Sequence, residues 1–132
     1  MGVRFTEREL DIMQVLWDRG EATVAEVQEH LADSLAYNTV LTMLRVLEDK
    51  GHVTRSTEGR AHRYRSAVER DEAGRSALGR VTKKLFRGSP EALLLNLVKQ
   101  PGVTREEVRR MRDLLDRALR DAVGSAADEE DA

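Results

Sequence analysis

The chain has 132 residues, a formal net charge of −2 and no cysteine, which excludes disulfides and thiolate metal sites. Its 40 % apolar, 35 % charged and 4 % aromatic residues suit one small, mainly helical domain, or a small domain with an appended helical region. Because the whole chain is slightly acidic, affinity for nucleic acid would have to come from a local basic patch.

Two short helices are predicted at the N-terminal end. Thr6 and Glu9 form a capping box at the start of the first helix, which ends at Gly20. Thr23 and Glu26 form a second capping box, and we expect that helix to end near residue 33. Apolar residues at three- and four-residue spacing give each helix one buried face.

A third helix is predicted over 37–50, with Gly51 directly after its end. One of its faces carries the apolar residues Val40, Met43, Leu44 and Leu47. The opposite side carries Asn38, Thr39, Thr42, Arg45 and Asp49. Three short helices with a tight turn between the second and third are typical of a helix-turn-helix.

A basic β-hairpin is predicted to follow, with strands over 52–56 and 61–66 and a turn over 57–60. Gly59 can take the positive φ that the turn needs, and Tyr64 is expected to pack inward. The stretch 50–65 holds five basic residues, Lys50, Arg55, Arg60, Arg63 and Arg65, against the single acid Glu58. A helix-turn-helix followed by a basic hairpin indicates a winged helix.

From residue 68 the pattern is helical. We expect a helix over 69–87, a short leucine-rich helix capped by Ser89, and a third helix that begins at a Thr104–Glu107 capping box. The leucines of the short helix point nearly all round, so it should be buried. The last helix carries a coiled-coil-like apolar seam.

This apolar surface exceeds what one small chain needs, and we expect it to hold two copies together, although the helices could instead fold back on their own winged helix. The candidate dimerisation residues are Leu94, Leu97, Val108, Met111, Leu115 and Ala118. The predicted organisation is a winged-helix domain at 1–67, a helical dimerisation domain at 68–123 and a disordered acidic tail at 124–132.

The third helix and the hairpin together predict contact with double-stranded DNA. A helix fits the major groove, where Asn38, Thr39, Thr42 and Arg45 could reach base edges or phosphates and Tyr37 could hold a phosphate. In the hairpin, Arg60 and Arg63 are placed to touch phosphates, with help from His62. The alternative is a solvated helix face and hairpin charges that only aid solubility.

Other chemistries find no support in the sequence. His30, His52 and His62 lack metal-ligand spacing, so no metal and no cofactor are expected. There is no nucleophile motif, no glycine-rich phosphate loop and no H-E-x-x-H pair, which argues against an enzyme. No stretch suits a signal peptide or a membrane span, so we expect a cytoplasmic protein without a membrane partner.

Four segments carry a resemblance to a known family. They are T-x-x-E-x-x-I-M-x-x-L-W in the first helix, AYNTVLTMLRVLEDKG, GRAHRYR, and the helical region up to about residue 123. With these segments the chain resembles the penicillinase-repressor (BlaI/MecI/CopY) family of transcriptional regulators. The resemblance implies a homodimeric repressor with an N-terminal winged helix, a C-terminal dimerisation domain and dyad-symmetric operators of TACA/TGTA type.

Two departures from the family pattern bear on how such a repressor would be released. Copper-responsive members carry a C-terminal cysteine motif, which this chain lacks. β-Lactam-responsive members are cut by a protease at an Asn-Phe bond, and here the comparable position reads Asn96-Leu97, a candidate cleavage site or simply a polar residue on a helix surface. Two other functions stay open, a small-molecule-responsive winged-helix regulator and a protein-interaction module without DNA binding.

Overall fold

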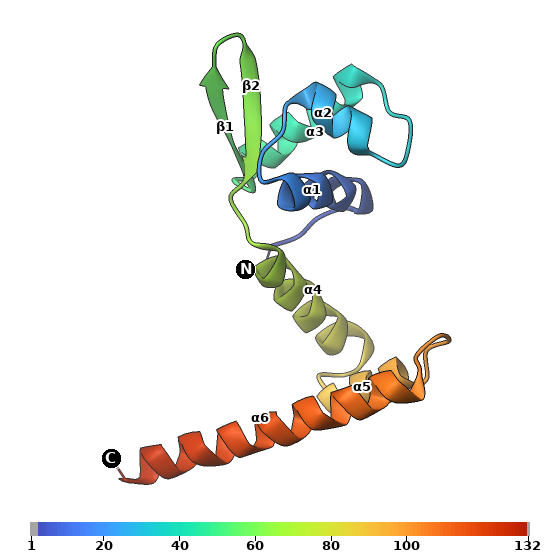
Figure 1. Ribbon diagram of the computed structural model, residues 1–132, viewed down its shortest axis with the longest axis vertical. Coiled ribbons are helices and arrows are strands. Elements are labelled where there is room, and N and C mark those ends of the chain that lie inside the picture. The colour runs from blue at the N-terminus through green and yellow to red at the C-terminus, as the bar shows by residue number, and fades with distance from the viewer. Residues whose placement is uncertain (1–2, 132) are drawn as a thin grey trace. The chain divides into compact units, whose positions relative to one another are not determined.

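The computed structural model describes residues 3–131 and divides into two compact units, one up to Val81 and one from Thr82. Over these residues it forms six helices and one two-stranded antiparallel sheet (Figure 1). This confirms the predicted fold class, mainly helical with three helices and a hairpin at the N-terminal end. In the same range, none of the helices has both the length and the apolarity of a membrane span.

The first unit begins with three short helices, α1 (Glu7–Arg19), α2 (Val24–His30) and α3 (Tyr37–Asp49). Both predicted capping boxes are present, and Gly20 takes the positive φ of 87° that ends α1. The prediction that α2 runs to about residue 33 was wrong. It ends at His30 because Leu31 is extended, with φ −75° and ψ 138°, and packs against the core.

The core of the first unit lies between these helices and the hairpin. Its largest fully buried side chains come from all of these elements: Tyr64, Ile12, Met13, Leu16, Leu44, Leu47, Val27, Val40 and Val53. The inward position predicted for Tyr64 is confirmed, whereas Met43 is half-buried at the core edge. Burying each large apolar side chain contributes about 1.5–3 kcal/mol, so this cluster fixes the position of α3.

The hairpin consists of β1 (Val53–Glu58) and β2 (Ala61–Ser66), paired in the register Val53↔Ser66 to Glu58↔Ala61. The second strand has the predicted bounds, whereas the first begins one residue later and runs two residues further than predicted, because Gly59, with a φ of 65°, allows a turn of only two residues. Ala22 pairs with Tyr64 in an antiparallel bridge and joins the segment between α1 and α2 to the hairpin.

The indole of Trp17 holds the segment that leaves the hairpin. Its Nε1 donates to the carbonyl oxygen of Val68 at 2.8 Å and to Oγ of Ser66 at 3.0 Å. The first part of α4 (Arg70–Leu85) then belongs to the first unit. The boundary between compact units therefore falls after Val81, later than the predicted boundary at 67/68, and the predicted functional division stays a prediction.

The second unit contains the end of α4, α5 (Pro90–Val98) and α6 (Arg105–Asp131). The expectation that α5 is buried was wrong for the single chain, since none of its residues is buried and Leu95 is 53 % exposed. The helix α6 continues to Asp131 through the segment where a disordered tail was expected. Alanine and glutamate, which favour helix, are frequent there, and residue 132 lies outside the described residues.

Candidate nucleic-acid interface

One face of α3 presents the polar side chains that the sequence singled out. Tyr37, Asn38, Thr39, Thr42 and Arg45, called here the reading face, are all exposed. Among the residues that the structure describes, none of these five side chains has a hydrogen-bond or ion-pair partner. Their donors and acceptors are therefore available to another molecule.

The N-terminal end of α3 adds backbone donors to the reading face. Its N-cap residue, Ala36, makes no side-chain capping bond, and the first turn contains no acidic residue. The turn before it is held by Gln28, whose Nε2 donates to the carbonyl oxygen of Leu35 at 3.0 Å. Uncapped N–H groups at a helix start, together with the positive end of the helix dipole, favour an anion such as a phosphate.

The C-terminal end of α3 is tied to α1 through a buried carboxylate. Glu9 is 4 % exposed and accepts hydrogen bonds from the backbone N–H of Thr6 at 2.8 Å and from Nζ of Lys50 at 3.0 Å. Burial alone would raise the pKa of Glu9, but the bonds from Thr6 and Lys50 outweigh burial and hold this pKa below its ordinary value. The ion pair between Glu9 and Lys50 therefore holds the C-terminal end of α3 against α1.

The tip of the hairpin, which forms the wing of the winged helix, carries exposed polar side chains. Arg60 lies in the two-residue turn, and His62 follows on β2, both with exposed side chains. Nδ1 of His62 lies 3.1 Å from Oγ1 of Thr57, its partner across the hairpin. Arg60 is thus the wing arginine placed farthest out along the turn, as expected for a residue that would meet a phosphate.

The base of the wing holds arginines that are already paired. Arg63 lies 3.7 Å from Glu21 and 3.6 Å from Glu26, and Arg65 lies 3.6 Å from Glu21. Sequence reasoning missed Glu21 and Glu26, because the charge count stopped at residues 50–65. The Ala22↔Tyr64 bridge brings these acids to the hairpin, and no signal in the sequence marks that pairing.

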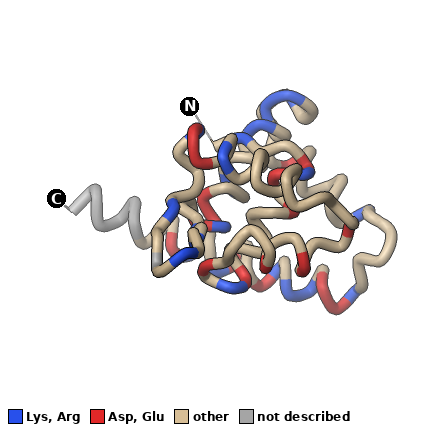
Figure 2. The backbone as a smooth tube through the Cα atoms, turned by 90° about the horizontal axis from the view of Figure 1, so that it is seen from above, with Lys and Arg blue, Asp and Glu red and all other residues tan. Residues whose placement is uncertain are grey.

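Further ion pairs reduce the free positive charge of the same stretch. Arg55 lies 3.5 Å from Glu48, and Lys50 pairs with Glu9. The hydrogen bond from Arg19 at 2.6 Å, with further bonds from Thr23, lowers the pKa of Glu26. Figure 2 shows basic and acidic residues interspersed along the backbone rather than separated. Among the described residues, the basic excess of the stretch 50–65 is therefore largely compensated by ion pairs, and Arg60 is the arginine of this stretch that has none.

The candidate dimerisation residues of the second unit lie on an open apolar groove. Leu94, Val108, Met111 and Leu115 line it together with Leu95 and Val98, and its volume is about 370 Å³. Leu115 is 51 % exposed and Val108 is 38 % exposed. Leu97 and Ala118, also predicted to contribute, are exposed but do not line this groove.

The candidate cleavage bond Asn96-Leu97 lies inside α5. The side-chain amide of Asn96 donates to the carbonyl oxygen of Ala92 at 2.8 Å, one helical turn earlier. Both residues are exposed. Asn96 is thus a polar residue on a helix surface, and the bond after it is held in helical rather than extended backbone.

Comparison with known proteins shows the family to which this chain belongs. The model of the penicillinase repressor family matches residues 5–117. The chain belongs to the penicillinase repressor family. This is a family of transcriptional repressors rather than of enzymes, and the chain is a DNA-binding repressor of this family.

Two relatives show how far the similarity extends. The transcriptional regulator BlaI of Mycobacterium tuberculosis (strain H37Rv) is 34 % identical over 114 residues, which cover 81 % of this chain and 80 % of that protein. The methicillin resistance regulatory protein MecI of Staphylococcus aureus (strain N315) is 22 % identical over 111 residues, which cover 83 % of this chain and 90 % of that protein.

Solved structures are also similar. The solution structure of the DNA-binding domain of the repressor BlaI aligns with 55 % of this chain and 93 % of that chain, with 26 % identity and a TM-score of 0.48. A MarR family protein from Bacillus stearothermophilus aligns with 92 % of this chain and 77 % of that chain, with 21 % identity and a TM-score of 0.50. The second likeness concerns the fold alone.

Proposed function

We propose that the chain represses transcription as a homodimer that occupies a dyad-symmetric operator, with α3 in the major groove and the wing on the adjacent phosphates. The observation that carries this proposal is the reading face, five exposed side chains without partners among the described residues beside an uncapped helix start. A two-fold dimer presents this face twice, so it reads two half-sites related by the same symmetry.

The apolar groove on α5 and α6 supports the dimer. Leucine and valine side chains of α5 and α6 that are 38–58 % exposed are costly in water, and burying them between two copies offsets that cost: Leu95, Val108 and Leu115 in the groove, and Leu97 and Leu114 outside it. Joining two winged helices turns the second half-site contact into an intramolecular event, which raises the affinity for the whole operator. Loss of the dimer would remove this gain and release the DNA.

The wing residues have different parts in this proposal. Arg60 and His62 meet phosphates directly, whereas Arg63 reaches a phosphate only by exchanging its pairs with Glu21 and Glu26. Such partly exposed pairs are worth about 0–1 kcal/mol each, so the exchange is cheap. The helix α3 supplies selectivity, since Asn38 and Arg45 can form bidentate bonds with base edges.

Selection from a random duplex library tests the proposal, because the bound sequence emerges from the selection itself. The expected result is a site with dyad symmetry, two half-sites about one helical turn apart and a stoichiometry of two chains per site. An asymmetric site bound by one chain would contradict the dimer. Failure to enrich any sequence would instead favour a protein-interaction module.

We further propose that cleavage of the Asn96-Leu97 bond by a protease releases the repressor from DNA. A protease needs an extended backbone, so α5 would have to open locally before cleavage. Within the single chain no residue of α5 is buried, so the chain's own core does not oppose this opening. The test is incubation of the purified chain with lysate from induced cells, followed by mass spectrometry. Fragments ending at Asn96 support the site, and an intact chain during derepression refutes it.

A further inference from the structure

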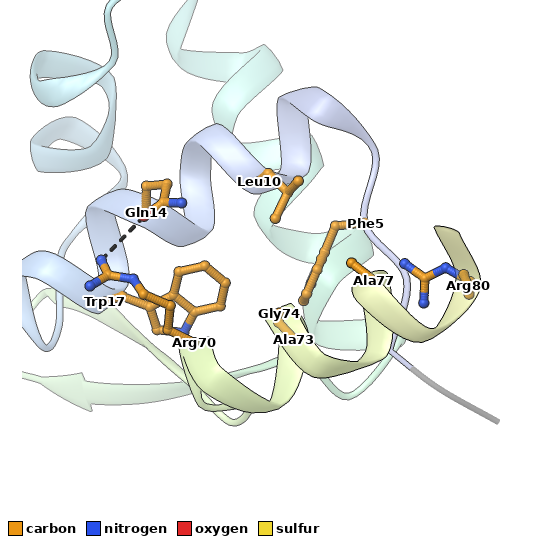
Figure 3. Close-up of a pocket in the computed structure, with 9 residues that line it drawn as sticks. All are labelled: Phe5, Leu10, Gln14, Trp17, Arg70, Ala73, Gly74, Ala77 and Arg80. Atoms are coloured by element: carbon orange, nitrogen blue, oxygen red, sulfur yellow. Dashed lines mark hydrogen bonds between the residues drawn. The ribbon is translucent and has the colours of Figure 1, made fainter. Parts of the chain in front are cut away.

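A pocket in the first unit is not used by the proposed DNA contacts. It lies between α1, with the segment before it, and the first part of α4, and has a volume of about 210 Å³. Phe5, Leu10 and Trp17 line one side, and Ala73, Gly74 and Ala77 line the other (Figure 3). The small residues of α4 leave the room that larger side chains would fill, and the volume suits a single ring rather than a larger ligand.

The walls of this pocket are suited to an aromatic ring. Phe5 and Trp17 meet edge to face, with ring centroids 6.3 Å apart, and both are only half-buried. Leu10 is 37 % exposed although it lies on a helix that packs against the core. Aromatic side chains attract a further ring in edge or offset geometry, beyond what the buried area contributes.

Two arginines line the pocket, and their charges are not equivalent. Arg70 lies over the Trp17 ring at 5.5 Å, and its NH2 group donates to Asp18 at 2.6 Å and to Gln14 at 3.2 Å. The positive charge of Arg70 is therefore already matched by a carboxylate. In Figure 3, Arg80 lies at the opposite end of the pocket from Arg70.

Arg80 is a half-buried cation whose charge is not matched. Its NH1 group donates to the carbonyl oxygen of Val3 at 2.6 Å and to Oγ of Ser76 at 3.0 Å, and both acceptors are neutral. No carboxylate lies within ion-pair distance of it in the part of the chain that the structure describes. These two bonds fix the guanidinium and leave its other N–H groups free, in the fork geometry that carboxylates match.

We propose that this pocket binds a small aromatic carboxylate, with the ring between Phe5, Trp17 and the small residues of α4 and the carboxylate on Arg80. An apolar body fills the pocket, and an anionic end matches the unpaired cation. The site lies within the first unit, and the proposal does not depend on dimerisation or on the operator.

Fluorescence titration with benzoate tests the site, because Trp17 is the single tryptophan of the chain and lines the pocket. We expect a saturable change with a dissociation constant of about 1 mM or below, as suits a ligand of this size. Benzamide has the same ring without the charge and should bind at least about tenfold more weakly, because a charge-assisted hydrogen bond is lost. A change that rises linearly with benzoate, or is equal for both compounds, overturns the proposal.

Variants separate the ring contacts from the charge. Arg80→Gln should weaken benzoate binding at least about tenfold and bring it to the level of benzamide. Arg70→Gln should change it less than about threefold, because Asp18 already compensates that arginine. Arg75→Gln is the matched control, an exposed arginine of α4 that does not line the pocket. Equal weakening by all three substitutions would refute the assignment to Arg80.

Gly74→Leu tests the room in the pocket without changing any charge. A Cβ added at Gly74 has no atom within 4 Å, so a larger side chain can enter the open space and the helix is not strained. We expect the saturable signal to disappear while circular dichroism and the melting temperature show a folded chain. Unchanged benzoate binding in this folded variant would overturn the proposal, and the Arg80→Gln result decides it if the variant does not fold.

Discussion

Replacing Arg60 by alanine should flatten the salt dependence of operator binding more than replacing Arg63 does. Each phosphate contact contributes about −0.9 to the slope of log affinity against log salt. A dimer carries Arg60 twice, so Arg60→Ala should reduce the slope by about 1.8. Between about 50 and 200 mM salt, the gap between the native protein and the variant should then shrink about tenfold.

Arg63→Ala should change the slope less, because the positive charge of Arg63 is shared with Glu21 and Glu26 at 3.7 and 3.6 Å. Glu21→Gln should do the opposite and steepen the slope, since it removes the carboxylate beside Arg65 and leaves Arg63 with Glu26 alone. The assay is fluorescence anisotropy of a labelled duplex at four salt concentrations, with Arg75→Ala as the control. An Arg60→Ala slope equal to the native slope would refute the placement of the wing on DNA.

Four further predictions concern the reading face, the core, the pH dependence of stability and the dimer. Asn38→Ala and Arg45→Ala should each cost about 1–3 kcal/mol of discrimination between operator variants in competition binding, and unchanged sequence preference in both would contradict the reading face. Leu44→Ala should lower the free energy of unfolding in urea by about 2–5 kcal/mol, because Leu44 is fully buried. A decrease below about 1 kcal/mol would contradict this, since it would mean that neighbouring side chains fill the cavity. Because the folded pKa of Glu9 is lowered, its carboxylate stabilises the fold above the ordinary value of 4.5, and this contribution disappears as the pH falls through the folded pKa. Urea unfolding of Glu9→Gln should therefore show a weaker loss of stability below pH 4.5 than the native chain, and identical pH profiles would exclude this role. Leu115→Lys should yield monomers in sedimentation experiments and weaken operator binding while the winged helix stays folded; an intact dimer would place the interface elsewhere.

Local sequence signals were enough for most of the first unit. The capping boxes at Thr6–Glu9 and Thr23–Glu26 and the positive φ of Gly51 are interactions between residues close in sequence, so they can be read without a fold. The same holds for the reading face, because helical periodicity separates Asn38 and its neighbours from the buried residues. Family membership followed from the order of these segments.

Pairing between distant segments could not be read in this way. The end of α2 at His30 depends on how Leu31 meets the core, and the partners of Arg63 depend on the bridge between Ala22 and Tyr64. The exposure of α5 was also unexpected, since its leucines indicate burial but do not say whether their own chain or a second copy covers them.

The sequence by itself determined where most helices and strands begin, which face of α3 is polar and how many charges the wing holds, because these follow from spacing and composition. Only the tertiary structure decided which of those charges remain free. Glu21, Glu26 and Glu48 reach the wing arginines through backbone pairing and packing, and an arginine's availability depends on what lies within a few ångströms of it. For the same reason the unmatched charge of Arg80 beside an apolar pocket is visible only in the folded chain.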